Sequence, residues 1–138
     1  MDTFSKSKRS EIMAKVSGMN TKPEILVRKY LFSKGFRYRK NVLSLPGKPD
    51  IVLPKYKTII FIHGCFWHGH ENCESAKLPA SNIAYWTRKI SSNIKRDLQN
   101  NESLRLLGWD VIVIWESELK AKNKEEKLSL LVKELKEI

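Results

Sequence analysis

The chain has 138 residues and carries 26 basic residues against 15 acidic ones, a formal net charge of +11. This length suits one domain with one core, and the 41% hydrophobic content excludes a disordered chain. There is no apolar stretch long enough to span a bilayer, and the polar start lacks the apolar core of a signal peptide. We therefore expect a cytoplasmic protein with no membrane partner.

The basic excess is concentrated at the start of the chain. Residues 1–50 hold twelve Lys or Arg against four Asp or Glu, so +8 of the +11 lies in the first third. Lysine and arginine neutralise phosphates and release counterions, so this clustering favours a nucleic-acid partner over a role in solubility alone. Residues 1–20 are predicted to be a basic arm, with a short helix around Ser10–Val16.

The first well-marked element is a helix over Lys22–Ser33. Thr21-Lys-Pro-Glu24 has the form of a capping box with proline in the first turn, and Gly35 is placed to end the helix. Three strands are predicted to follow, over Phe36–Leu43, Asp50–Leu53 and Thr58–Ile62, because these runs are rich in apolar, aromatic and β-branched residues and are separated by turn residues.

The second half of the chain contains a loop, a helix, a strand and a helix. His63–Pro79 has no clean period and is predicted to be a functional loop. A long helix is expected from Ser81 or Asn82 to Leu107, with a break near Gln99–Asn101, followed by a buried strand over Asp110–Trp115. The final amphipathic helix presents an apolar stripe of Leu128, Leu131, Leu135 and Ile138. This order predicts a single α/β domain over residues 1–138, built around a mixed sheet.

Asp50 follows Pro49 at the start of a predicted strand. A carboxylate there is well placed to hold a hard divalent cation such as magnesium, which prefers oxygen ligands. The alternative is an ordinary turn-forming aspartate.

Both cysteines lie in the loop. Cys65-x4-His70-x2-Cys73 offers three soft ligands that suit zinc, while simple burial of the thiols is the alternative. Three ligands do not close a tetrahedral structural site, so the fourth must come from elsewhere, and the chain has no third cysteine.

His63 and His68 remain available for acid–base chemistry, because imidazole titrates near neutrality. Asp97 is a candidate to orient one of them, and an exposed helix charge is the alternative. Glu24 is explained by the capping box, which does not exclude a second role.

Three aromatic residues, Phe66, Trp67 and Trp86, are candidates to wedge between base pairs. For Phe66 and Trp67 the alternative is a small loop core around a metal. For Trp86 it is packing in the main core.

Four motifs resemble those of one known family. They are Arg9-Ser10…Met13, Leu45-Pro-Gly-Lys-Pro-Asp50, Phe61-Ile-His-Gly-Cys-Phe-Trp-His68 and Asn93-Ile-Lys-Arg-Asp97. From Lys8 to Glu116 the chain resembles the very-short-patch repair (Vsr) DNA mismatch endonucleases, and the third motif is the most specific.

The resemblance implies a restriction-endonuclease-like fold, a three-layer sandwich whose mixed β-sheet is flanked by helices. Phe61-Ile62-His63 takes the place of the usual Glu-x-Lys. It also implies a bacterial, cytosolic enzyme that nicks one strand of duplex DNA 5′ of the T in a T·G mismatch. Such mismatches arise when 5-methylcytosine deaminates, which implies a functional link to a cytosine-5 DNA methyltransferase. We expect a monomer.

The resemblance also implies roles for individual residues. Asp50 would bind magnesium with help from the Ile62 carbonyl, and Glu24 would hold the ion through water. His68 would activate water with Asp97 as its partner, and His63 would contact the scissile phosphate or leaving oxygen. Phe66, Trp67 and Trp86 would intercalate from the major groove, and Met13 on the DNA-contacting arm would press from the minor groove.

The chain departs from the family pattern at three places. Ile62 stands where the family usually has threonine, Ser117 stands where it has the fourth zinc-binding cysteine, and Cys73 lies one residue further from His70. Zinc on Cys65, His70 and Cys73 is therefore expected without a family-type fourth ligand, with water or a carboxylate such as Glu118 in its place, and an empty site is the alternative. Other expectations that remain open are a restriction-like or mobile-element nuclease of the same fold and a non-catalytic, zinc-stabilised DNA-binding module.

Overall fold

A computed structural model of the chain describes residues 21–120 and 122–137. The predicted basic arm, its helix around Ser10–Val16, Met13 and the last stripe residue Ile138 lie outside the described residues. Within them, no helix is both long and apolar enough to cross a membrane.

A four-stranded mixed sheet forms the centre of the fold. Its strands are β1 (Arg39–Lys40), β2 (Ile51–Leu53), β3 (Thr58–His63) and β4 (Asp110–Trp115), in spatial order β1-β2-β3-β4. The pairs β1–β2 and β2–β3 are antiparallel and β3–β4 is parallel, so the predicted mixed sheet is confirmed. The parallel pair is in register from Thr58↔Asp110 to His63↔Trp115, which places the segments that follow both strands at one end of the sheet.

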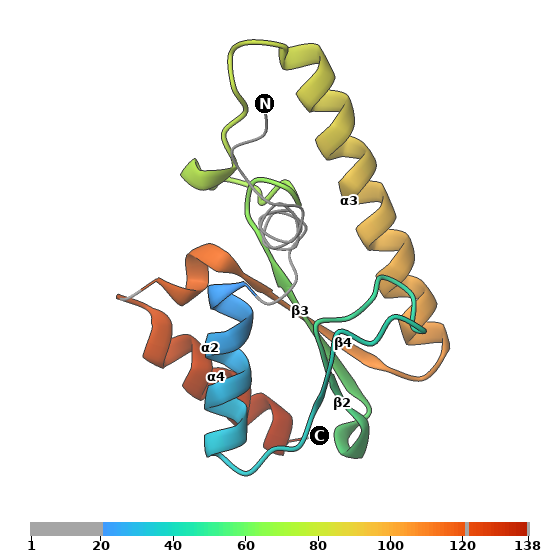
Figure 1. Cartoon of the computed structure of the whole chain (residues 1–138), viewed down its shortest axis with the longest axis vertical. Coiled ribbons are helices and arrows are strands. Elements are labelled where there is room, and N and C mark those ends of the chain that lie inside the picture. Colours follow the sequence, from blue (N-terminus) through green and yellow to red (C-terminus); the bar gives the residue numbers. More distant parts are fainter. Residues whose placement is uncertain (1–20, 121, 138) are drawn as a thin grey trace, which may run out of the picture.

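Helices cover both faces of this sheet. Figure 1 shows α2 (Lys22–Ser33) and α4 (Lys124–Lys136) side by side on one face and α3 (Ile83–Leu106) on the other. Short 3-10 turns, η1 (Pro54–Tyr56), η2 (Glu74–Ala76) and η3 (Glu116–Leu119), lie in the connections. The α/β architecture agrees with the expected restriction-endonuclease-like sandwich.

The core is divided between these two faces because successive side chains of a strand point to opposite sides. Ile60 and Ile62 pack with the α2 and α4 residues Leu31 and Leu131. The intervening Phe61 packs instead with Leu104 of α3.

The α2 helix has the predicted bounds. The Thr21 hydroxyl accepts a hydrogen bond from the Glu24 backbone N–H at 3.5 Å, and Gly35 has a φ of +87° just beyond the last turn. The strand predicted over Phe36–Leu43 is wrong in extent, because only Arg39–Lys40 pairs with β2. Phe36 instead belongs to the end of the helix, where its N–H donates to the Leu31 carbonyl and its ring is buried.

The predicted break in α3 near Gln99–Asn101 is also wrong, because the helix is continuous from Ile83 to Leu106. Asn101 is buried and lines a cavity, so tertiary contacts hold a polar segment of low intrinsic propensity in the helix. Gly108, with a φ of +94°, follows the end of the helix as predicted.

Strand β4 is less buried than predicted, since only Ile114 of its six residues is fully buried. It lies at the edge of the sheet and has a neighbour on one side only. On α3, Ile90 is buried while Ile83 and Ile94 stay partly exposed, because the first half of the helix projects beyond the sheet (Figure 1).

Candidate active site

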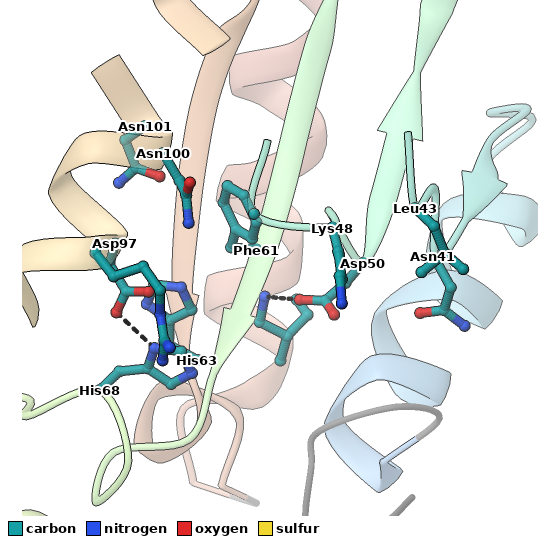
Figure 2. A pocket seen from close by; sticks show the side chains of 13 residues that line it. Asn41, Leu43, Lys48, Asp50, Phe61, His63, His68, Asp97, Asn100 and Asn101 are labelled. Carbon is teal, nitrogen blue, oxygen red and sulfur yellow. Dashed lines mark hydrogen bonds and ion pairs between the residues drawn. The ribbon is translucent and has the colours of Figure 1, made fainter. Parts of the chain in front are cut away.

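A cavity of about 530 Å³ lies between α3, strand β3 and the loop that precedes β2. We call it the active-site cavity. It brings together Asp50, Ile62, His63, His68 and Asp97, which come from the edge of β2, from β3, from the following loop and from α3. In Figure 2 the two histidines and Asp97 lie close to one another, while Asp50 lies across β3 from them. Its lining is completed by Asn41, Leu43, Gly47, Lys48, Phe61, Arg96, Asn100 and Asn101.

Asp50 is held by the antiparallel pairing of β2 with β3. Its Oδ2 accepts a hydrogen bond from the Ile62 backbone N–H at 2.8 Å (Figure 2). The pKa of the Asp50 carboxyl is raised to about 7, mainly by burial and also by the charge and hydrogen bond of the nearby Glu24 carboxyl, while the Ile62 N–H and Arg28 act to lower it.

Glu24 is turned inward from the first turn of α2. It is 1% exposed, and its Oε2 lies 3.6 Å from Arg28 Nη1. The Thr21 hydroxyl caps the Glu24 N–H, so the cap is compatible with a carboxylate directed at Asp50. The buried Glu24 raises the pKa of the half-buried Asp50 carboxyl, and a divalent cation would relieve this repulsion while binding both sets of oxygen atoms, so these residues fit a hard metal ion.

His68 and Asp97 form the closest polar contact in the cavity. His68 Nδ1 lies 2.6 Å from Asp97 Oδ2, and the side chains are 29% and 19% exposed. When Nδ1 carries the proton that Asp97 accepts, Nε2 is the basic nitrogen of the ring. The pair therefore has the geometry of an oriented general base.

His63 is stacked on His68. The ring centroids are 3.8 Å apart with an interplanar angle of 3°, and His63 is only 5% exposed. The pKa of His63 is lowered to about 4, mainly by burial and also by the neighbouring His68, so this ring is neutral at neutral pH. Among the described residues its Nδ1 has no hydrogen-bond partner.

The thiol cluster, Cys65, His70 and Cys73, is also assembled. Its ligand atoms lie within 4.8 Å of one another, a spacing that one metal ion can bridge. The His70 ring stacks on Trp115 with centroids 4.2 Å apart.

Ser117 lies beside all three residues of the thiol cluster. Its Oγ is 3.4 Å from His70 Nδ1 and hydrogen-bonds with both thiols. The parallel register explains this, because Cys65 and Ser117 each follow the paired residues His63 and Trp115 by two positions. Glu118, the carboxylate named above as a fourth ligand, instead accepts from the Trp115 N–H and pairs with Lys127.

Phe66, Trp67 and Trp86 form one aromatic cluster at the start of α3. Ring centroids are 5.2 Å apart for Phe66–Trp67, 5.3 Å for Phe66–Trp86 and 5.9 Å for Trp67–Trp86. Trp67 is 39% exposed and Trp86 is half-buried, so Trp86 packs in this cluster rather than in the main core.

Sequence reasoning assigned no role to three polar residues around the cavity. Lys48 and Arg96 line it, and the buried Asn93 hydrogen-bonds to Arg96. Asn93 and Arg96 belong to the Asn93–Asp97 motif, and membership of this motif is the sequence signal that indicates a role for them.

The family model described as DNA mismatch endonuclease Vsr matches residues 1–75. The "Type II nicking enzyme V.NmeAIP" of Neisseria meningitidis is 53% identical over 137 residues, covering 99% of this chain and 97% of that protein. The "Type II nicking enzyme V.XorIIP" of Xanthomonas oryzae is 44% identical, over 86% of each chain. The "DNA mismatch endonuclease Vsr" of Escherichia coli is 37% identical, over 89% of this chain and 78% of that protein.

Proposed function

The chain belongs to the Vsr family of DNA mismatch endonucleases and is a DNA endonuclease, and we propose that it nicks one strand of duplex DNA 5′ of the T in a T·G mismatch. The observation that supports this most strongly is the convergence of Asp50, His68 and Asp97 on one cavity, because hydrolysis of a phosphodiester needs a charge-neutralising centre beside an oriented base.

Asp50, the carbonyl oxygen of Ile62 and, through water, Glu24 would hold a magnesium ion as the charge-neutralising centre. When bound, it neutralises charge on the phosphate and stabilises the leaving oxygen. The inward-facing Glu24 and the raised pKa of Asp50 support this assignment, because two carboxyl groups held close together offer oxygen ligands to a divalent cation.

His68 removes a proton from the attacking water at Nε2, while Asp97 holds Nδ1–H and stabilises the imidazolium that forms. His63 is the neutral neighbour that contacts the scissile phosphate or the leaving oxygen. Its low pKa keeps a second positive charge away from His68 at the moment of proton transfer.

The aromatic cluster opens the duplex from the major groove, and Met13 presses from the minor groove. A mismatched pair stacks and pairs less well than a matched one, so separating it costs less free energy. The partly exposed ring of Trp67 supports this role, because it is already placed outside the core.

The thiol cluster would bind zinc and so brace the loop that carries Phe66, Trp67 and His68. Its three ligand atoms suit zinc, and Ser117 or a water would take the fourth position. The zinc is structural, because it takes no part in the chemistry at Asp50.

The substrate arises where 5-methylcytosine deaminates, which links the chain to a cytosine-5 DNA methyltransferase. We propose that it acts as a monomer in the bacterial cytosol, with residues 1–138 as one domain and residues 1–20 as its DNA-contacting arm.

The direct test measures nicking of T·G, other mismatched and fully paired duplexes with magnesium. We expect nicking of the T·G duplex, lost in Asp50→Ala and retained in Asp110→Ala, which removes an exposed aspartate at the start of β4. Equal rates on paired DNA would indicate a restriction-like nuclease. Full activity of Asp50→Ala would refute the assigned centre, and binding without any nicking would indicate a non-catalytic DNA-binding module.

A further inference from the structure

Asn93 lies between α3 and the loop that carries the aromatic cluster. Its side chain is 5% exposed and uses both ends of its amide. Nδ2 donates to the Trp67 carbonyl oxygen at 2.9 Å, and Oδ1 accepts from Arg96 Nη2 at 2.9 Å. Such an amide holds its two partners in one relative position, because breaking either bond leaves a buried polar group unsatisfied.

The apolar contact beside Asn93 is equally close. A Cβ added to Gly69 would lie 2.6 Å from Ile94 Cδ1 and 2.8 Å from Ile90 Cγ2. The loop backbone therefore lies directly on α3. A shift of the loop would have to disturb both this packing and the buried Asn93 bond.

Arg96 also lines the active-site cavity, together with Asp97 and His68. Its bond to Asn93 uses one N–H of a guanidinium that carries several donors in a planar fork, the geometry that matches a phosphate. Lys48 lines the same cavity from the loop before β2. The cavity thus has a cationic side chain on two of its walls.

Given the proposed function, on which this inference rests, we propose that Arg96 binds a backbone phosphate of the cleaved strand. Asn93 is a positioning residue that fixes this guanidinium relative to Trp67. The link sets the spacing between the base step that the aromatic cluster opens and the phosphodiester that reaches Asp50 and His68.

The phosphate contact is tested by the salt dependence of binding to a T·G duplex, measured by anisotropy without divalent metal. Arg96→Ala lowers the slope of log K against log salt by about 0.9, the value for one lost phosphate contact, and weakens binding about tenfold. Arg96→Lys keeps the charge and retains most of the slope. Lys133→Ala, an exposed α4 residue on the opposite face of the sheet, leaves the slope unchanged.

The positioning role predicts a different pattern for Asn93→Ala. Each end of the link still functions alone, so binding and its salt slope stay as in the wild type. The single-turnover rate at saturating protein falls about 10- to 100-fold, as expected for a misplaced substrate, and some nicks move to neighbouring phosphodiesters. Asn93→Ser, which keeps a polar group at this buried site, is the second variant if Asn93→Ala does not fold.

Two outcomes overturn the inference. An unchanged salt slope in Arg96→Ala removes the phosphate contact. The positioning role is refuted if Asn93→Ala or Asn93→Ser nicks with the rate and product pattern of the wild type. It is also refuted if the variant loses binding and rate to the same extent. Failure of the wild type to nick a T·G duplex would refute the proposed function instead, because the salt slope is measured without cleavage.

Discussion

Replacing Asp97 with asparagine tests the proposed base most directly. The carboxylate accepts a charge-assisted hydrogen bond from His68 Nδ1 at 2.6 Å, and this bond strengthens when His68 takes up a proton. Because the pair is partly exposed, we expect a loss of about 2 to 3 kcal/mol of transition-state stabilisation, equal to a rate reduced roughly 30- to 160-fold. Single-turnover nicking of a T·G duplex at saturating protein measures this rate.

Glu102→Gln is the matched control, since it removes one exposed negative charge from the same helix away from the cavity. It should nick at the wild-type rate, and Asp97→Asn should bind the duplex as tightly as the wild type. A rate for Asp97→Asn within about threefold of the wild type would refute the reasoning, because a 2.6 Å partner of the general base cannot be removed at so small a cost.

Three further predictions concern stability and metal binding. Gly69→Ala combines a φ of +62° with a 2.6 Å approach of the added Cβ to Ile94, so its free energy of unfolding in urea should fall by about 2 to 4 kcal/mol. Gly64→Ala is the control, because its added Cβ meets nothing closer than 4.0 Å and its free energy of unfolding should fall much less. His63 has a folded-state pKa of about 4, below that of the unfolded chain, so its contribution to the free energy of unfolding is present above pH 6.5 and is lost as the pH falls. Between pH 8 and pH 5 the free energy of unfolding of the wild type should therefore fall by about 2 kcal/mol more than that of His63→Gln. Equal losses would contradict the burial argument. Ser117→Cys should hold zinc more tightly against a competing chelator and strengthen the thiolate-to-cobalt absorption of the cobalt form; unchanged spectra would show that residue 117 lies outside the metal site.

Local signals predicted the elements that depend on local chemistry. The Thr21–Glu24 cap and Gly35 are sufficient to bound α2, because capping groups and a left-handed glycine act within one turn. The same reasoning placed a break in α3 that does not exist, since Asn101 is held in the helix by burial against the cavity. It also extended β1 too far, because Phe36 follows the end of α2 and its aromatic side chain packs in the core there instead of belonging to a strand.

The sequence by itself determined which residues are candidates for the chemistry. Its histidines and cysteines all lie between His63 and Cys73, so their proximity follows from the chain alone, and the motif around them was sufficient to identify the family. Only the tertiary structure decided which of them meet distant partners. His68 pairs with Asp97, Trp67 with Asn93 and His70 with Ser117, across separations of 29, 26 and 47 residues. These contacts depend on how α3 packs on the loop and on the parallel register of β3 with β4. No local sequence pattern specifies this register, because it is set by the packing of both faces of the sheet at once.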